Sequence, residues 1–132
     1  MDGIFNIMGG KRKSLFNKIG HERGTFAENI IERIFNDRFQ TGDVPKWLTG
    51  YERATVEDDS RGIDGWFYTD VGKIPLQIKS SRTGKRHAAE KNPNIPTVIV
   101  RAGDSENTIF SQCISAIGPE RKKYLKERQI EE

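Results

Sequence analysis

The residues best suited to chemistry lie in the middle of the chain, where one acid precedes two short apolar segments. Asp64 comes directly before Gly-Trp-Phe-Tyr, and Gln77 and Lys79 lie within Pro-Leu-Gln-Ile-Lys-Ser-Ser. Alternate residues of a strand share a face, so Gln77 and Lys79 point the same way. A four-residue loop over 70–73 sets Asp64 opposite Lys79, whereas an odd-length loop or a bulge sends Asp64 elsewhere. A carboxylate, an amide oxygen and an ammonium group on one face suit metal-assisted phosphodiester cleavage.

This pattern resembles the bipartite motif of the PD-(D/E)XK nuclease superfamily, which includes restriction endonucleases, Mrr-like enzymes and Holliday-junction resolvases. The motif is an acid followed after a gap by (Asp/Glu/Gln)-x-Lys; here Asp64, a twelve-residue gap and Gln77-Ile78-Lys79 match it. The resemblance covers roughly residues 20 to 101. It implies that Asp64, the Gln77 side chain and the backbone carbonyl of Ile78 bind Mg²⁺ or Mn²⁺, and that Lys79 orients the attacking water. Gln77 is a departure, since the superfamily most often has Asp or Glu there.

The same three residues also fit an ordinary amphipathic hairpin. In that alternative, Asp64 caps a turn, Gln77 lies on a solvated face and Lys79 protects an edge strand. The strand that contains Gln77 and Lys79 is, however, expected to be central in the sheet. We therefore favour the nuclease-like interpretation.

A helix predicted over 24–39 offers a further carboxylate. Its apolar stripe consists of Ala27, Ile30, Ile31, Ile34 and Phe35. Glu28 lies at the edge of this stripe and can reach the polar end of the sheet, whereas Glu32 points further toward solvent. The superfamily often carries a metal-binding glutamate on its first helix, and the resemblance implies Glu28 in that role. Thr25-x-x-Glu28 is also a capping box, in which Glu28 closes the start of the helix.

Basic residues gather in three segments, although the net charge is only +3. Cations near a carboxylate site hold phosphates and offset their repulsion; a merely solvated face is the alternative for each segment. We expect DNA contacts at Lys11, Arg12, Lys13, Ser80, Ser81, Arg82, Lys85, Arg86 and His87. The third segment, residues 121–128, has interleaved glutamates and is interpreted as a solvated helix face.

Hydrophobic periodicity and turn residues predict the elements that position these groups. The predicted strands are residues 51–57, 65–69, 74–80 and 97–101. The predicted helices are 24–39 and 108–117, with a mobile loop over 82–95 and a final helix after a break at Gly118-Pro119. This order predicts an α/β protein with a single-domain, restriction-endonuclease-like core, a mixed sheet of about four strands flanked by helices. The expected parts are a basic, weakly structured segment 1–22, a core domain 23–118 and a charged helix 119–132.

Composition limits the class of protein. The 132 residues, 34% hydrophobic and 31% charged, suit one soluble globular domain. No apolar run has membrane-spanning length and residues 1–10 lack a signal-peptide pattern, so no membrane partner is expected. Cys113 is the only cysteine, which excludes a disulfide framework and a cysteine-based zinc site. These features favour a cytoplasmic protein.

We therefore expect a metal-dependent endonuclease that hydrolyses DNA with Mg²⁺ or Mn²⁺. The small size favours recognition of a DNA structure such as a Holliday junction over sequence-specific restriction, and a homodimer fits the two symmetric cuts of a junction. The alternative is a non-catalytic nucleic-acid-binding module that keeps the fold, which the neutral Gln77 favours. A protein-interaction domain is a third hypothesis, without a specific motif.

Overall fold

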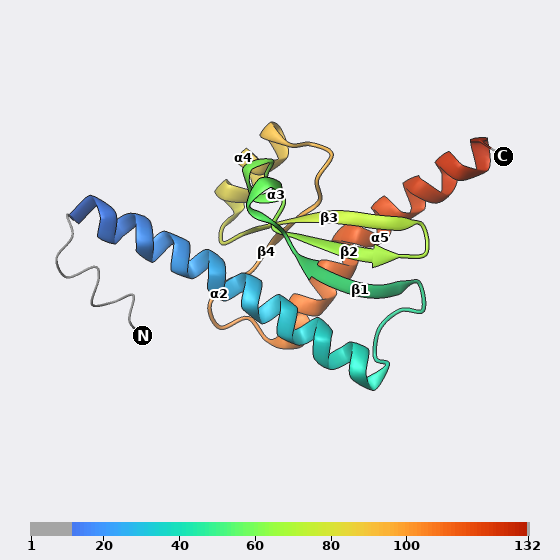
Figure 1. Ribbon diagram of the computed structural model, residues 1–132, viewed down its shortest axis with the longest axis horizontal. Coiled ribbons are helices and arrows are strands. Elements are labelled where there is room, and N and C mark those ends of the chain that lie inside the picture. Colours follow the sequence, from blue (N-terminus) through green and yellow to red (C-terminus); the bar gives the residue numbers. More distant parts are fainter. Residues whose placement is uncertain (1–11, 132) are drawn as a thin grey trace.

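Four strands form one mixed sheet among the described residues, which are 12–131 for the backbone and 26–128 for the side chains (Figure 1). In this computed structural model the strand order is β1-β2-β3-β4; the first three strands are antiparallel and β4 runs parallel to β3. The elements are α2 (Arg12–Thr41), β1 (Leu48–Arg53), α3 (Val56–Ser60), β2 (Gly65–Thr69), β3 (Gly72–Lys79), α4 (Arg82–Lys91), β4 (Thr97–Ile99) and α5 (Glu106–Glu131). The expected α/β class, with a mixed sheet flanked by helices, is confirmed.

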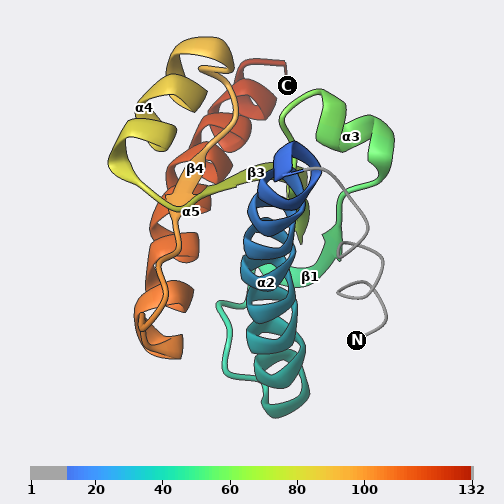
Figure 2. The ribbon, with the colours of Figure 1, turned by 90° about the vertical axis from the view of Figure 1, so that its left-hand side faces the viewer.

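The core lies on the face of the sheet that α2 and α5 cover. Ile31 and Phe35 of α2 are fully buried against Phe67, Ile74 and other strand residues. The whole apolar stripe expected on this helix packs in the core, with Ile30 at its half-buried edge. Figure 2 shows α2 and α5 side by side. Burial of this apolar surface is the main force that holds the two helices on the sheet.

Helix α4 covers the opposite face, beside β3 and β4. Alternate residues of a strand face opposite sides. Leu76 is buried in the core with α2 and α5, whereas Gln77 lines a pocket with Ala88 and other residues of α4. The segment 82–95 was expected to be a mobile loop, and for residues 82–91 that expectation is wrong. Ser81 begins the helix as its N-cap, accepting a hydrogen bond from the Gly84 N–H at 3.0 Å.

The turn of the β2–β3 hairpin is tighter than expected. Thr69 pairs with Gly72, so the loop contains only Asp70 and Val71 instead of four residues. Gly72 has a φ of +114°, a conformation that glycine tolerates. The Thr69 hydroxyl donates to the Gly72 carbonyl at 2.6 Å and accepts from the Val71 N–H at 3.2 Å. These bonds stabilise the short loop.

The open end of the same hairpin also differs from the expected register. Gly65 lies opposite Leu76, and the Asp64 N–H donates to the carbonyl of the same Leu76 at 2.8 Å. Asp64, just before β2, and Gly65, the first residue of β2, thus both meet Leu76 of β3. This is the arrangement of a β-bulge, which changes the direction of a side chain. The predicted pairing of Asp64 with Lys79 is therefore wrong.

Both long helices exceed their predicted bounds. Residues 12–22, expected to be weakly structured, form the first turns of α2. The expected break at Gly118-Pro119 is absent, since both residues lie inside α5. Pro119 removes a bond to the carbonyl of Ser115, and both residues are exposed, so water can satisfy that carbonyl. Burial of Ile117 and Cys113 holds the helix in place.

The C-terminal half of α5 is not merely a solvated face. Arg121 binds the Asp70 carboxylate with two hydrogen bonds of 2.8 and 2.7 Å, and Arg128 donates to the Val71 carbonyl at 2.9 Å. The expectation of a solvated face is therefore wrong for these two arginines, which hold the β2–β3 turn.

No helix in the described part of the chain combines the length and apolar character that a membrane crossing requires.

Candidate functional site

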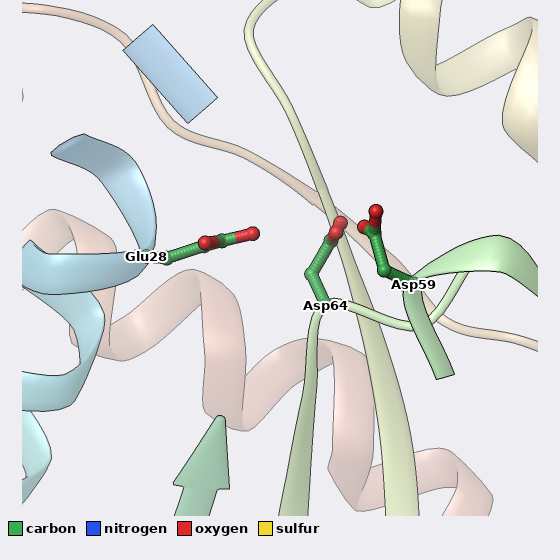
Figure 3. A group of neighbouring side chains, drawn as sticks. All are labelled: Glu28, Asp59 and Asp64. Atoms are coloured by element: carbon green, nitrogen blue, oxygen red, sulfur yellow. The ribbon is translucent and has the colours of Figure 1, made fainter. Parts of the chain in front are cut away.

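Three carboxylates converge near the open end of the hairpin: Glu28 of α2, Asp59 of α3 and Asp64 before β2. One oxygen of each lies within 4.8 Å of the others. Figure 3 shows the three side chains turned toward one another from three separate elements. We call these residues the acidic cluster. Two of its members, Glu28 and Asp64, are residues that the sequence singles out, and the structure brings them together.

Two hydrogen bonds to the backbone of β3 hold Asp64 in place. The Ile78 N–H donates to the Asp64 Oδ2 at 2.7 Å, and the Asp64 N–H donates to the Leu76 carbonyl. Burial raises the pKa of Asp64 to about 6; the Ile78 hydrogen bond opposes that rise, and the negative charge of Glu28 adds to it. The positive charge of Lys79 also lowers this pKa. A half-buried carboxylate among like charges gains much from a cation.

Glu28 reaches the cluster from the middle of α2. Because α2 begins at Arg12, Thr25 is an internal helix residue, and the capping-box alternative for Glu28 is wrong. The Glu28 Oε2 instead accepts a hydrogen bond from Arg53 of β1 at 2.9 Å. Arg53 also donates to Asn29 at 2.7 Å. Arg53 therefore fixes the orientation of Glu28 and offsets one of the negative charges.

Asp59 is the residue that sequence reasoning missed. It lies on α3, a one-and-a-half-turn helix within the segment expected to hold the end of a strand and a loop. The available signal was the acidic run Glu57-Asp58-Asp59, five residues before Asp64, preceded by Thr55 as a cap. Only the tertiary structure places that run beside α2.

Gln77 and Lys79 line a pocket of about 420 Å³ beside the cluster. Asp59 lines the same pocket, so it joins the acidic cluster to the two motif residues of β3. Gln77 is only 5% exposed, and its Oε1 has no hydrogen-bond partner among the described residues. An unpaired buried oxygen is costly, and a ligand in the pocket would remove that cost.

The backbone around Gln77 leaves little freedom to its amide. Gly62 follows α3 with a φ of +85°, and a Cβ there would lie 3.0 Å from Gln77 Nε2 and 2.6 Å from Asn92 Nδ2. Glycine is thus required at this close approach.

The backbone carbonyl of Ile78 points toward the edge of β3 that Asp64 meets. The N–H and the carbonyl of one strand residue face the same edge of the strand, and the Ile78 N–H donates to Asp64.

The predicted DNA-binding residues separate into several positions. Lys11 lies outside the described residues, as do the side chains of Arg12 and Lys13, which begin α2. His87 lines the pocket of Gln77 and Lys79, together with Lys91, while Lys85 and Ser80 each line a different pocket. Arg82 and Arg86 are exposed on α4, and Ser81 is its N-cap. Of the predicted DNA-binding residues with described side chains, His87 of α4 is therefore the one that lines the candidate site.

The donor set fits a hard divalent cation. Mg²⁺ binds oxygen ligands at about 2.1 Å, so oxygens on opposite sides of the ion lie about 4 Å apart. The carboxylate spacing of up to 4.8 Å needs only small side-chain rotations or a bridging water. The unpaired Gln77 oxygen is neutral and suits the same type of ion. Together these groups can hold a cation and place Lys79 beside it.

Comparison with protein-family models, curated proteins and solved structures finds no match to this chain.

Proposed function

We propose that this protein is a metal-dependent endonuclease that hydrolyses phosphodiester bonds of DNA. The observation that carries the proposal is the acidic cluster of Glu28, Asp59 and Asp64, adjacent to a pocket lined by Gln77 and Lys79. Oxygen ligands beside a lysine are the groups that hydrolysis of a phosphodiester needs. The resemblance to the PD-(D/E)XK superfamily rests on the same residues.

The proposal assigns each residue a role on the basis of the resemblance and of its chemistry. Asp64, the Gln77 Oε1, the Ile78 carbonyl and Glu28 would hold Mg²⁺ or Mn²⁺. The ion supplies a Lewis acid that makes the reaction feasible near neutral pH. Lys79 orients the attacking water and stabilises negative charge on the phosphate, since an ammonium group donates hydrogen bonds and accepts none.

Helix α4 would hold the DNA near this site. His87 and Lys91 line the pocket, and Arg82 and Arg86 are exposed on the same helix. The charges of Lys91, Arg82 and Arg86 offset the repulsion between phosphates and the acidic cluster. Recognition of a branched DNA by a homodimer, inside the cell, is part of the proposal, because two copies of the site fit the two symmetric cuts of a four-way junction.

The test is cleavage of defined DNA substrates by the purified protein. Linear duplex, single-stranded, flap and four-way-junction DNA are incubated with Mg²⁺, with Mn²⁺ and with a chelator. We expect metal-dependent products, most from the four-way junction. Asp64→Asn serves as the inactive control, because it keeps an acceptor for the Ile78 N–H.

The neutral Gln77 favours a second function, a non-catalytic module that binds nucleic acid. Salt-sensitive binding to DNA without cleavage under any metal would support that function and reject the enzyme. Absence of both binding and cleavage would reject both.

A further inference from the structure

Helix α3 carries two adjacent carboxylates with different environments. Asp58 is used by the fold: its oxygens accept from the Thr55 N–H at 3.1 Å, from Arg61 at 2.8 Å and from the Trp66 indole at 2.9 Å. The Trp66 hydrogen bond above all lowers the pKa of Asp58 to about 2. Among the residues with described side chains, none donates a hydrogen bond to the Asp59 carboxylate.

The bonds of Asp58 also fix where Asp59 lies. Thr55 and Asp58 form a complete capping box, and the Asp59 N–H donates to the Thr55 carbonyl at 2.9 Å. Trp66 of β2 ties the helix to the sheet through Asp58. Asp59, whose carboxylate accepts no hydrogen bond from the described side chains, therefore lies beside Asp64 and Glu28 (Figure 3).

The charges of the site explain what Asp59 adds. Gln77 leaves β3 without the acid that most often stands in this motif, and Glu28 is partly neutralised by Arg53. Without Asp59, Asp64 would be the only carboxylate of the acidic cluster with an unpaired negative charge among the described residues. Asp59 restores a second one, within 4.8 Å of Asp64 and in the pocket that Gln77 lines.

We propose that Asp59 is a metal ligand of this site and supplies, from α3, the negative charge that Gln77 lacks on β3. This inference rests on the proposed metal-dependent function. Gln77, which lines the same pocket, independently indicates a ligand there, because its buried Oε1 has no hydrogen-bond partner among the described residues. The site then has three carboxylates and a neutral amide oxygen, a set that hard cations prefer.

The test measures binding of Mn²⁺ alone, by electron paramagnetic resonance and calorimetry, without DNA. The variants are Asp59→Asn, Asp59→Asn with Gln77→Glu, and Glu57→Gln as a matched control. Glu57 is an exposed acid of the same helix outside the cluster, so its variant removes the same charge from α3. Circular dichroism verifies that each variant is folded.

We expect Asp59→Asn to weaken Mn²⁺ binding by on the order of tenfold to a hundredfold, because one charge close to the ion is lost. Gln77→Glu in that background should recover most of the lost affinity, and Glu57→Gln should bind as the wild type does. Wild-type affinity in Asp59→Asn overturns this inference but leaves the proposed function intact. A double variant as weak as Asp59→Asn overturns the compensation of charge between the two positions. A wild-type protein that binds no Mn²⁺ at millimolar concentration overturns the proposed function itself.

Discussion

The two ends of the β2–β3 hairpin each carry an aspartate, and their environments are opposite. At the turn, Asp70 receives two hydrogen bonds from Arg121, which lower its pKa. At the open end, Asp64 is half-buried beside Glu28 and Asp59, and burial raises its pKa to about 6. Figure 1 shows α5 near the turn and α3 and α4 at the open end.

The two aspartates therefore suit different purposes: Asp70 stabilises the fold, and Asp64 is available to bind a ligand. At the turn, the Asp70 carboxylate is paired with Arg121. At the open end, the acidic cluster has three carboxylates, and among the described residues only Glu28 of the three has an ion-pair partner, Arg53. Unfavourable like charges persist where a function requires them. The comparison predicts that changes at the open end affect activity most and changes at the turn affect stability alone.

The largest effect is expected from Asp64→Asn. Metal-dependent cleavage should fall by on the order of a hundredfold or more, because a charge that holds the metal is lost. The measurement is the initial rate of DNA cleavage at saturating DNA, with the Glu57→Gln variant as a control for loss of a nearby charge. Retention of the wild-type rate would remove Asp64 from the mechanism.

Asp64→Asn, which lowers activity, should raise the free energy of unfolding. The Asp64 carboxyl titrates at 3.8 when unfolded and near 6 when folded, so the folded protein binds the extra proton between these values. The stability of the wild type therefore falls as pH rises from about 4 to about 6 and stays lower above. In a chelator at pH 7, Asp64→Asn should be more stable by about 2 kcal/mol, after allowance for solvent screening. Urea unfolding at pH 4 and pH 7 measures this; a difference that is the same at both pH values contradicts the assignment.

The next effect concerns Lys79. Lys79→Met keeps the aliphatic stem that lies near Gly84 and removes the ammonium group. Cleavage should fall by about tenfold to a hundredfold, while Mn²⁺ affinity is retained, because lysine is a donor and not a metal ligand. Calorimetry with Mn²⁺ is decisive: a collapse of affinity comparable to that of Asp64→Asn would assign Lys79 a different role.

A smaller effect is expected from α4. Lys91→Gln should weaken DNA binding a few-fold and reduce the slope of log affinity against log salt by about one, as for one lost phosphate contact. Lys122→Gln, an exposed lysine on α5, is the matched control. Fluorescence anisotropy at several salt concentrations measures both. Equal slopes for the two variants would mean that α4 does not contact the phosphates.

The smallest effect on activity is expected at the turn. Arg121→Met removes both bonds to Asp70 but can still cover Trp47, over which the guanidinium lies at 5.2 Å. The melting temperature should fall by a few degrees, and the rate of cleavage should not change. A change in cleavage rate with an unchanged melting temperature would contradict the assignment of activity to the open end of the hairpin and of stability to its turn.

Local patterns in the sequence predicted much of the fold. The bounds of β2 agree with the prediction, and β3, β4 and the apolar stripe of α2 lie where periodicity indicates. Helix α4 was missed because its only buried residue is Ala88, so it shows no apolar stripe. The continuity of α5 through Pro119 was missed because a proline is a strong local signal for a break, and packing on both sides overrides it.

The sequence by itself determined which side chains offer oxygen atoms or a positive charge, and which of them share one face of a strand. It therefore indicated Asp64, Gln77, Lys79 and Glu28 before any contact was known. Only the tertiary structure decided the two-residue turn, the bulge at Asp64 and the arrival of Asp59 from α3. The physical reason is that alternation and helical period act over a few residues. The contacts that bring Asp59 to Glu28, and Gly62 to Gln77 and Asn92, join segments far apart in the sequence.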